Sequence, residues 1–228
     1  MTLRLGLPSK GRLMEDAFAW LAARGIEVAR DAARGYAASA SLPGLEPVLV
    51  SAGEVPRELL AGRLHLGVTG ADLVAEAGGG LEAMAPMGFG RADVVVAVPD
   101  WWADVRTLDD LDAVAAQFRR THGRRLRVAT KYHRLARASL AGAGVADYVL
   151  VDSGGATEGA VRAEAAEAVC DITSTGETLR ANGLRVLDDG LVLRSEAVLW
   201  RSPAAEWGEG ERAVLAEVGE RLGVELEP

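Results

Sequence analysis

Residues 168–179 read AVCDITSTGETL, an apolar stretch followed by hydroxyl side chains and a glycine. The apolar part, 168–172, is typical of a buried strand, and a helical pattern begins after Gly176. A strand that leads through a short polar loop into a helix is the repeating unit of α/β proteins. The stretch therefore predicts an α/β fold with a polar loop at the end of one strand.

The same alternation extends outward from this stretch in both directions. Apolar runs typical of strands occur at 3–7, 47–51, 64–68, 93–98, 126–129, 148–151, 183–187 and 196–201. Helical patterns lie between them, among others at 13–23, 56–60, 158–167 and 210–222, and Thr107 has the sequence of a helix start. This order predicts mostly parallel sheets with helices on their faces, and its restart near residue 90 indicates a second lobe.

Composition narrows the class of protein. The 228 residues suffice for one large domain or two small ones, and the net charge of −8 argues against a nucleic-acid-binding surface. The apolar runs are too short to cross a membrane, and the N-terminus has no signal-peptide pattern. The single Cys170 excludes an internal disulfide framework. We therefore expect a cytoplasmic protein without membrane or nucleic-acid partners.

Lysine is used at only two positions, Lys10 and Lys131, among 25 basic residues. Each lysine follows a strand-like run and precedes a helix-like one. An arginine-rich composition could leave two lysines by chance. Alternatively, each ammonium serves as a compact point charge for a phosphate group.

The loop at 171–178 is the strongest candidate for a binding site. Backbone N–H groups at a helix start favour an anion, and hydroxyls add hydrogen bonds without bulk. Gly176 allows the backbone to approach a ligand closely. The hydroxyls are those of Thr173, Ser174, Thr175 and Thr178. The alternative is a helix cap with additional threonines.

Three other loops have residues suited to phosphate or sugar chemistry. Glu158, after a strand and a Ser-Gly-Gly turn, could accept hydrogen bonds from ribose or reach magnesium through water, although a capping arrangement is favoured for this segment. The segments Ser9-Lys10-Gly11-Arg12 and Thr69-Gly70-Ala71-Asp72 follow strands, where ligands of α/β sheets bind. Asp72 could instead only cap its helix. The three histidines match no metal site.

These residues resemble the signature of the ATP phosphoribosyltransferase family. The matching positions are Glu158, Ala166, Val169, Asp171-Ile172, Thr175-Gly176 and Thr178-Leu179. Glu164 departs from the signature, which usually has glycine there. Family-like segments also include 5–13, 66–73, 129–132 and 179–184, and both lysines lie inside them, which favours the phosphate interpretation.

The resemblance implies two lobes like those of periplasmic binding proteins, with a cleft between them and two crossings of the chain. We expect residues 1–90 with 184–228 to form the first lobe, on the ATP side, and 91–183 the second, which binds phosphoribosyl pyrophosphate (PRPP). The chain ends soon after Leu222. It therefore resembles the short form, which works as a homodimer within a hetero-oligomer with a regulatory subunit similar to histidyl-tRNA synthetase.

The resemblance also implies a reaction, the attack of adenine N1 of ATP on the anomeric carbon of PRPP with release of pyrophosphate. The site residues it implies for PRPP are Lys131, Glu158, Asp171, Thr173, Ser174, Thr175, Gly176 and Thr178. Those for ATP are Lys10, Arg12, Thr69, Gly70 and Asp72. Magnesium would arrive with PRPP, near Glu158, without direct protein ligands.

One departure concerns the cation that stabilises the leaving pyrophosphate. Many short-form members have two arginines where this chain reads Ser51-Ala52-Gly53-Glu54-Val55-Pro56. We expect Lys10 with Arg34, or else Arg30, to take that role. Two rival functions remain at this stage: a non-catalytic binding protein of the same architecture, and a phosphoribosyltransferase with another acceptor base.

Overall fold

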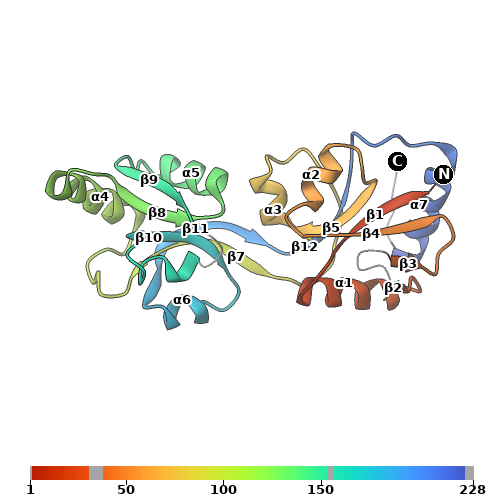
Figure 1. Ribbon diagram of the computed structural model, residues 1–228, viewed down its shortest axis with the longest axis horizontal. Helices are drawn as coiled ribbons and strands as arrows, with labels where there is room; N and C mark the ends of the chain where they lie inside the picture. The colour runs from red at the N-terminus through yellow and green to blue at the C-terminus, as the bar shows by residue number, and fades with distance from the viewer. Residues whose placement is uncertain (1, 31–37, 154–156, 224–228) are drawn as a thin grey trace. The chain divides into compact units, whose positions relative to one another are not determined.

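The computed structural model describes residues 2–30, 38–153 and 157–223, and divides the chain into two compact units (Figure 1). Unit 1 comprises Met1–Gly90 with Glu196–Pro228, and unit 2 comprises Arg91–Ser195. The expected restart near residue 90 therefore coincides with a boundary between units. No helix among the described residues is long and apolar enough to cross a membrane.

Unit 1 is built on a five-stranded sheet in the order β4-β1-β5-β12-β6. Its strands are β1 (Leu3–Pro8), β4 (Leu45–Val50), β5 (Leu66–Gly70), β6 (Glu82–Pro86) and β12 (Ala197–Arg201). Strand β1 pairs in parallel with β4 and β5, whereas β12 runs antiparallel to β5 and β6. The short strands β2 (Val28–Arg30) and β3 (Ala38–Ala40) form a separate antiparallel pair.

Helices pack against this sheet in two separate clusters, so the residues of its central strands β1 and β5 are almost all buried. The helices of unit 1 are α1 (Arg12–Ala22), α2 (Val55–Leu60), α3 (Ala71–Glu76) and α7 (Glu209–Leu222). Helix α1 buries Ala17 and Leu21, and α7 buries Leu215 and Val218, in one core with β1. Helix α2 packs with Leu64 in a second cluster.

Unit 2 has a five-stranded sheet in the order β11-β7-β10-β8-β9. Its strands are β7 (Ala92–Pro99), β8 (Leu126–Thr130), β9 (Tyr148–Asp152), β10 (Ala168–Thr173) and β11 (Leu184–Ser195). Strand β8 pairs in parallel with β9 and β10, whereas β7 runs antiparallel to β10 and β11. The helices are α4 (Leu108–His122), α5 (His133–Gly142) and α6 (Glu177–Ala181), with the 3-10 turn η1 (Thr157–Gly159). Both sheets thus combine a parallel part with antiparallel strands.

The return of the chain to unit 1 comes later than expected. Residues 184–195, expected in the first lobe, form β11 and pair with β7, so unit 1 resumes at Glu196. The pairing register shifts between Val186 and Leu191. Gly190 lies in that shift, and a Cβ there would come within 2.7 Å of the Val96 carbonyl oxygen. The irregularity allows a single strand to continue through Asp188-Asp189-Gly190, a sequence typical of a turn.

The prediction of a helix at 158–167 is also wrong. Only η1 and a series of turns follow Thr157, and Glu164 has a backbone φ of 55°, which an α-helix does not allow. The other end of the chain is as expected, because the helix predicted at 210–222 is α7. The helix start predicted at Thr107 is confirmed, since Thr107 and Asp110 form a capping box at the start of α4.

Glu167 links the starts of β8 and β10, two neighbouring parallel strands. Its carboxylate accepts hydrogen bonds from the guanidinium groups of Arg127 (2.7 Å) and Arg124 (3.0 Å) and from the Arg127 backbone N–H (2.8 Å). Burial alone would raise the pKa of Glu167, but the hydrogen bonds from Arg127 and Arg124 outweigh it and lower the pKa to about 2. This network holds the two parallel strands in register at the end opposite the β10–α6 loop.

Candidate functional site

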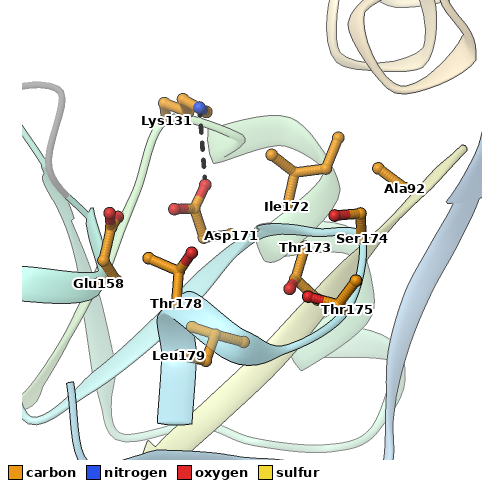
Figure 2. Close-up of a pocket in the computed structure, with 10 residues that line it drawn as sticks. All are labelled: Ala92, Lys131, Glu158, Asp171, Ile172, Thr173, Ser174, Thr175, Thr178 and Leu179. Atoms are coloured by element: carbon orange, nitrogen blue, oxygen red, sulfur yellow. Dashed lines mark ion pairs between the residues drawn. The ribbon is translucent and has the colours of Figure 1, made fainter. Parts of the chain in front are cut away.

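A pocket of about 380 Å³ lies in unit 2 where β10 leads into α6 (Figure 2). Seven of the residues predicted to bind phosphate or sugar line it: Lys131, Glu158, Asp171, Thr173, Ser174, Thr175 and Thr178. Gly176, the eighth, lies within the same turn. The remaining lining residues are Ala92, Ile172 and Leu179. Segments far apart in sequence therefore meet at the one loop that the sequence singled out.

The loop is a tight turn held by its own hydroxyls. The Thr173 hydroxyl accepts a hydrogen bond from the Gly176 N–H (2.8 Å), and the Thr175 hydroxyl accepts one from the Glu177 N–H (3.3 Å). Gly176 takes the left-handed conformation, with φ 71°, that begins α6. Thr173 and Thr175 thus act partly as the capping residues of the alternative interpretation, but each hydroxyl retains its proton for a ligand.

Ser174 and Thr178 are exposed, as Thr175 is, and add two further hydroxyls to the turn. Figure 2 shows the Thr178 side chain between Glu158 and the rest of the turn. Because a phosphate group takes several hydrogen bonds at once, a turn with two hydroxyls already oriented and two exposed is well suited to hold one. The Arg180 guanidinium donates to the Thr175 carbonyl (3.1 Å), which fixes the turn from its far side.

Asp171 and Lys131 form an ion pair at the base of the pocket. The Lys131 Nζ lies 3.7 Å from Asp171 Oδ1, too far for a hydrogen bond (Figure 2). Asp171 is only 6% exposed, and its Oδ1 has no hydrogen-bond partner among the described residues. A buried carboxylate oxygen without a donor is costly, so this atom suits a ligand that donates, such as a sugar hydroxyl.

Sheet topology explains why these two residues meet. Asp171 lies in β10, and Lys131 follows β8, its parallel neighbour in the sheet. The carboxyl ends of parallel strands lie at one edge, where ligands of α/β proteins bind. The ammonium of Lys131 remains half exposed and also lies 5.5 Å from the Tyr132 ring centroid. It can therefore reach a ligand anion without leaving Asp171.

Glu158 lies on the other side of the pocket, in η1, and is half-buried. The neighbouring Thr157 is buried and donates to the Ser153 hydroxyl (2.8 Å), which anchors the segment. Two carboxylates, Glu158 and Asp171, thus face one pocket. Magnesium typically uses one or two carboxylates together with substrate phosphates, so these residues fit a magnesium ion that arrives with a polyphosphate. Within the described ranges, no group of three His, Cys, Asp or Glu side chains is placed so that it could hold a metal ion.

The residues predicted to bind ATP lie in unit 1. Lys10 is exposed after β1, and Arg12 begins α1 with a side chain that is 91% exposed and 3.6 Å from Asp16. Gly70 ends β5, the parallel neighbour of β1, and caps α3. The hydroxyl of Thr69 donates to the Ala52 carbonyl (2.8 Å). The Asp72 side chain is buried in the first turn of α3.

These unit 1 positions share the carboxyl edge of one sheet, and their role toward ATP stays a prediction. Thr69 and Asp72 are buried, so they shape the junction where β5 leads directly into α3, while Lys10 and Arg12 offer exposed charge. Arg34, predicted to assist catalysis, lies outside the described residues. Arg30, its alternative, ends β2 and is exposed.

No local pattern in the sequence indicated Ala92 as a pocket residue. It begins β7, which runs antiparallel to β10, and its neighbour Asp93 pairs with Thr173. Only the antiparallel pairing brings this residue beside the loop. Its small side chain leaves the pocket open on that side, a feature that no local motif could indicate.

Fold and site together define a class: a two-unit α/β protein whose second unit has a pocket suited to a sugar phosphate. A family model for ATP phosphoribosyltransferase matches residues 51–222. An ATP phosphoribosyltransferase of Cereibacter sphaeroides is 58% identical over 99% of this chain and 98% of its own length. That of Nitrobacter winogradskyi is 51% identical over 92% of this chain and 67% of its own length. The chain therefore belongs to the ATP phosphoribosyltransferase family of enzymes, and the resemblance inferred from its sequence is confirmed.

Solved structures agree on the fold. The ATP phosphoribosyl transferase (HisG:HisZ) complex from Thermotoga maritima matches with a TM-score of 0.76 at 22% identity, over 97% of this chain and 96% of that one. The substrate-binding protein of an amino acid ABC transporter matches with a TM-score of 0.54 at 12% identity, over 98% and 92%. The expected likeness to periplasmic binding proteins is thus confirmed at the level of fold.

Proposed function

We propose that this chain transfers the 5-phosphoribosyl group from PRPP to N1 of ATP, giving N1-(5-phosphoribosyl)-ATP and pyrophosphate, the first step of histidine biosynthesis. One observation carries the proposal beyond family membership. The buried Oδ1 of Asp171, which accepts no hydrogen bond among the described residues, lies beside Lys131 and a turn rich in hydroxyls. This combination matches a ligand with an anionic phosphate next to donating sugar hydroxyls.

In this proposal, the turn at 171–178 binds the 5-phosphate through the hydroxyls of Ser174, Thr175 and Thr178 and the backbone at Gly176. Thr173 keeps the turn in shape. The ribose hydroxyls donate to the carboxylates of Asp171 and Glu158, and Lys131 balances negative charge. Magnesium carried by PRPP would neutralise part of the negative charge of the leaving pyrophosphate. The carboxylates orient the sugar so that its anomeric carbon faces the incoming base.

The reaction is a single displacement. Adenine N1 donates its electron pair to the anomeric carbon as the bond from that carbon to the pyrophosphate oxygen breaks, and the pyrophosphate leaves with that bond's electrons. No covalent enzyme intermediate is required, so the protein contributes position and charge. Lys10, Arg12, Thr69, Gly70 and Asp72 would bind ATP. Lys10 and Arg34 would stabilise the leaving group.

We further propose that the chain acts as the short-form catalytic subunit in the cytoplasm, as a homodimer within a hetero-oligomer with a regulatory subunit similar to histidyl-tRNA synthetase. One finding supports this assembly, because the Thermotoga maritima structure with the same fold is a HisG:HisZ complex.

The direct experiment mixes the full chain with ATP, PRPP and magnesium, with and without the regulatory subunit, and follows N1-(5-phosphoribosyl)-ATP by mass spectrometry. We expect product with at least one of the two mixtures, and about 100-fold less with Asp171→Asn, because a ribose-orienting carboxylate is lost. GTP and free adenine serve as competing acceptors. PRPP binding without product under either condition would instead favour the non-catalytic binding protein.

A further inference from the structure

A second cavity, of about 540 Å³, lies in unit 1 at the edge opposite the predicted ATP residues. Arg4, near the start of β1, and His65, just before β5, line it. Lys10 and Gly70 lie at or beyond the other ends of these same strands. The remaining charged lining residues are Arg63, Glu206 and Glu211. We call this space the α7 cavity, since Gly208 and Glu211 at the start of α7 close it.

Glu211 contributes a buried carboxylate to the α7 cavity. The residue is only 5% exposed, and its Oε2 has no hydrogen-bond partner within the described part of the chain. Its place in the first turn of α7 would suit a bond from the backbone of the capping residue Gly208, but α7 has no side-chain cap hydrogen bond. A buried carboxylate without a donor destabilises the protein unless something else donates to it.

Arg4 contributes the opposite charge to the same cavity. Across residues 2–30, 38–153 and 157–223, its guanidinium has no hydrogen bond and no carboxylate oxygen within 4.0 Å. Arg63 differs, because the Glu58 carboxylate binds it through two hydrogen bonds of 2.6 Å. The hydrogen bond from Arg63 lowers the pKa of the Glu58 carboxylate, and the charge of Arg4 also acts on this carboxylate and helps to lower its pKa. The cavity wall therefore carries one cation without a hydrogen bond and one carboxylate oxygen without a donor among the described residues, and the two do not reach each other.

His65 lies in the wall as a side chain fixed by two hydrogen bonds. Its Nδ1 accepts a hydrogen bond from the Arg4 backbone N–H (3.0 Å), so the proton is on Nε2, which donates to the Glu206 carbonyl (3.2 Å). Its ring also meets Trp207 edge to face, with centroids 5.1 Å apart. These contacts hold the wall between Arg4 and the start of α7, so the two charges keep their separation.

We propose that the α7 cavity binds a small zwitterion of the free amino acid class. The ammonium would donate to Glu211, and the carboxylate would pair with the Arg4 guanidinium. A single cation would be repelled by Arg4, and a single anion by Glu211, whereas a molecule with both charges satisfies both groups. This inference is independent of the proposed transferase activity, because none of its residues is assigned to either substrate.

Binding to the full chain, without ATP or PRPP, tests the proposal. Each common L-amino acid is screened by thermal shift, with n-butylammonium and butyrate as ligands of a single charge, and the hits are titrated by calorimetry. At least one amino acid should raise the melting temperature, by an amount that grows with the logarithm of its concentration relative to Kd. Its Kd should rise about tenfold or more in Glu211→Gln and in Arg4→Gln.

Glu209→Gln is the matched control, because Glu209 is exposed on the same turn of α7 and does not line the cavity. It should leave the affinity unchanged. Glu211→Gln without ligand should melt no lower than the wild type, since it removes a buried unpartnered charge. The proposal is overturned if no amino acid binds, if both cavity variants retain wild-type affinity, or if butylammonium or butyrate binds as tightly.

Discussion

Replacing Glu164 by glycine should stabilise the protein. Glu164 is the only non-glycine residue with positive φ (55°) among those described. The family signature that the sequence resembles usually has glycine at this position. Its backbone carbonyl accepts a hydrogen bond from the Arg127 guanidinium (2.8 Å), and this bond does not depend on the side chain. The substitution therefore removes the conformational penalty and keeps the contact.

The magnitude follows from two opposing effects. A residue with a Cβ in the left-handed region costs about 1–2 kcal/mol. Glycine gives the unfolded chain more freedom, which costs about 0.5–1 kcal/mol. Taken near the middle of each range, the two effects leave a net gain of about 0.5–1 kcal/mol for Glu164→Gly. For a chain of this size, each kcal/mol shifts the melting temperature by about 2–4 °C, so a rise of about 1–4 °C is expected.

Differential scanning calorimetry measures this shift, and two variants isolate its cause. Glu164→Ala removes the carboxylate but keeps the Cβ, so it should melt within about 1 °C of the wild type, as expected for an exposed charge. Ala163→Gly, at a neighbour without positive φ, should lower the melting temperature. If Glu164→Gly melts no higher than Glu164→Ala, backbone strain is not what the signature glycine relieves.

Three further predictions concern stability and the division of roles. Because folding lowers the pKa of Glu167 from 4.5 to about 2, the ionised carboxylate stabilises the folded protein at pH values above 4.5. This stabilisation is lost as the pH falls from 4.5 toward about 2. In Glu167→Gln, the melting temperature should therefore fall less steeply between these two pH values. Thr107→Ala should cost about 1 kcal/mol in urea unfolding, because the capping box of α4 is lost, and a change below a few tenths would contradict this. In steady-state kinetics, Lys131→Met should raise the KM for PRPP about tenfold or more and leave the KM for ATP unchanged, whereas Lys10→Met should raise the KM for ATP. The reverse pattern would exchange the two assignments.

Much of the fold follows from local sequence. The run at 168–179 has the apolar strand, the hydroxyl turn and the helix start that β10 and α6 show. The capping box at Thr107 is equally local, since its two partners are three residues apart. Such features depend on neighbours in the chain, so patterns of residue type suffice to predict them.

Features that depend on pairing between distant segments could not be predicted. Ala92 reaches the pocket only because β7 is antiparallel to β10, and Asp188-Asp189-Gly190 continues β11 only because Gly190 fits against β7. The 3.7 Å separation of Lys131 and Asp171 likewise depends on the register of two strands. Sequence indicated both residues as site candidates, but not that one carboxylate oxygen would be buried without a donor.

The central claim is that the β10–α6 turn holds the phosphate of PRPP, and calorimetric titration of the full chain with PRPP and magnesium tests it most directly. The Thr175→Val/Thr178→Val double variant should lose measurable binding while melting close to the wild type, since both side chains are exposed. Thr121→Val, at an exposed threonine of α4 away from the turn, should bind as the wild type does. Wild-type affinity in the double variant would contradict this account and move the phosphate elsewhere.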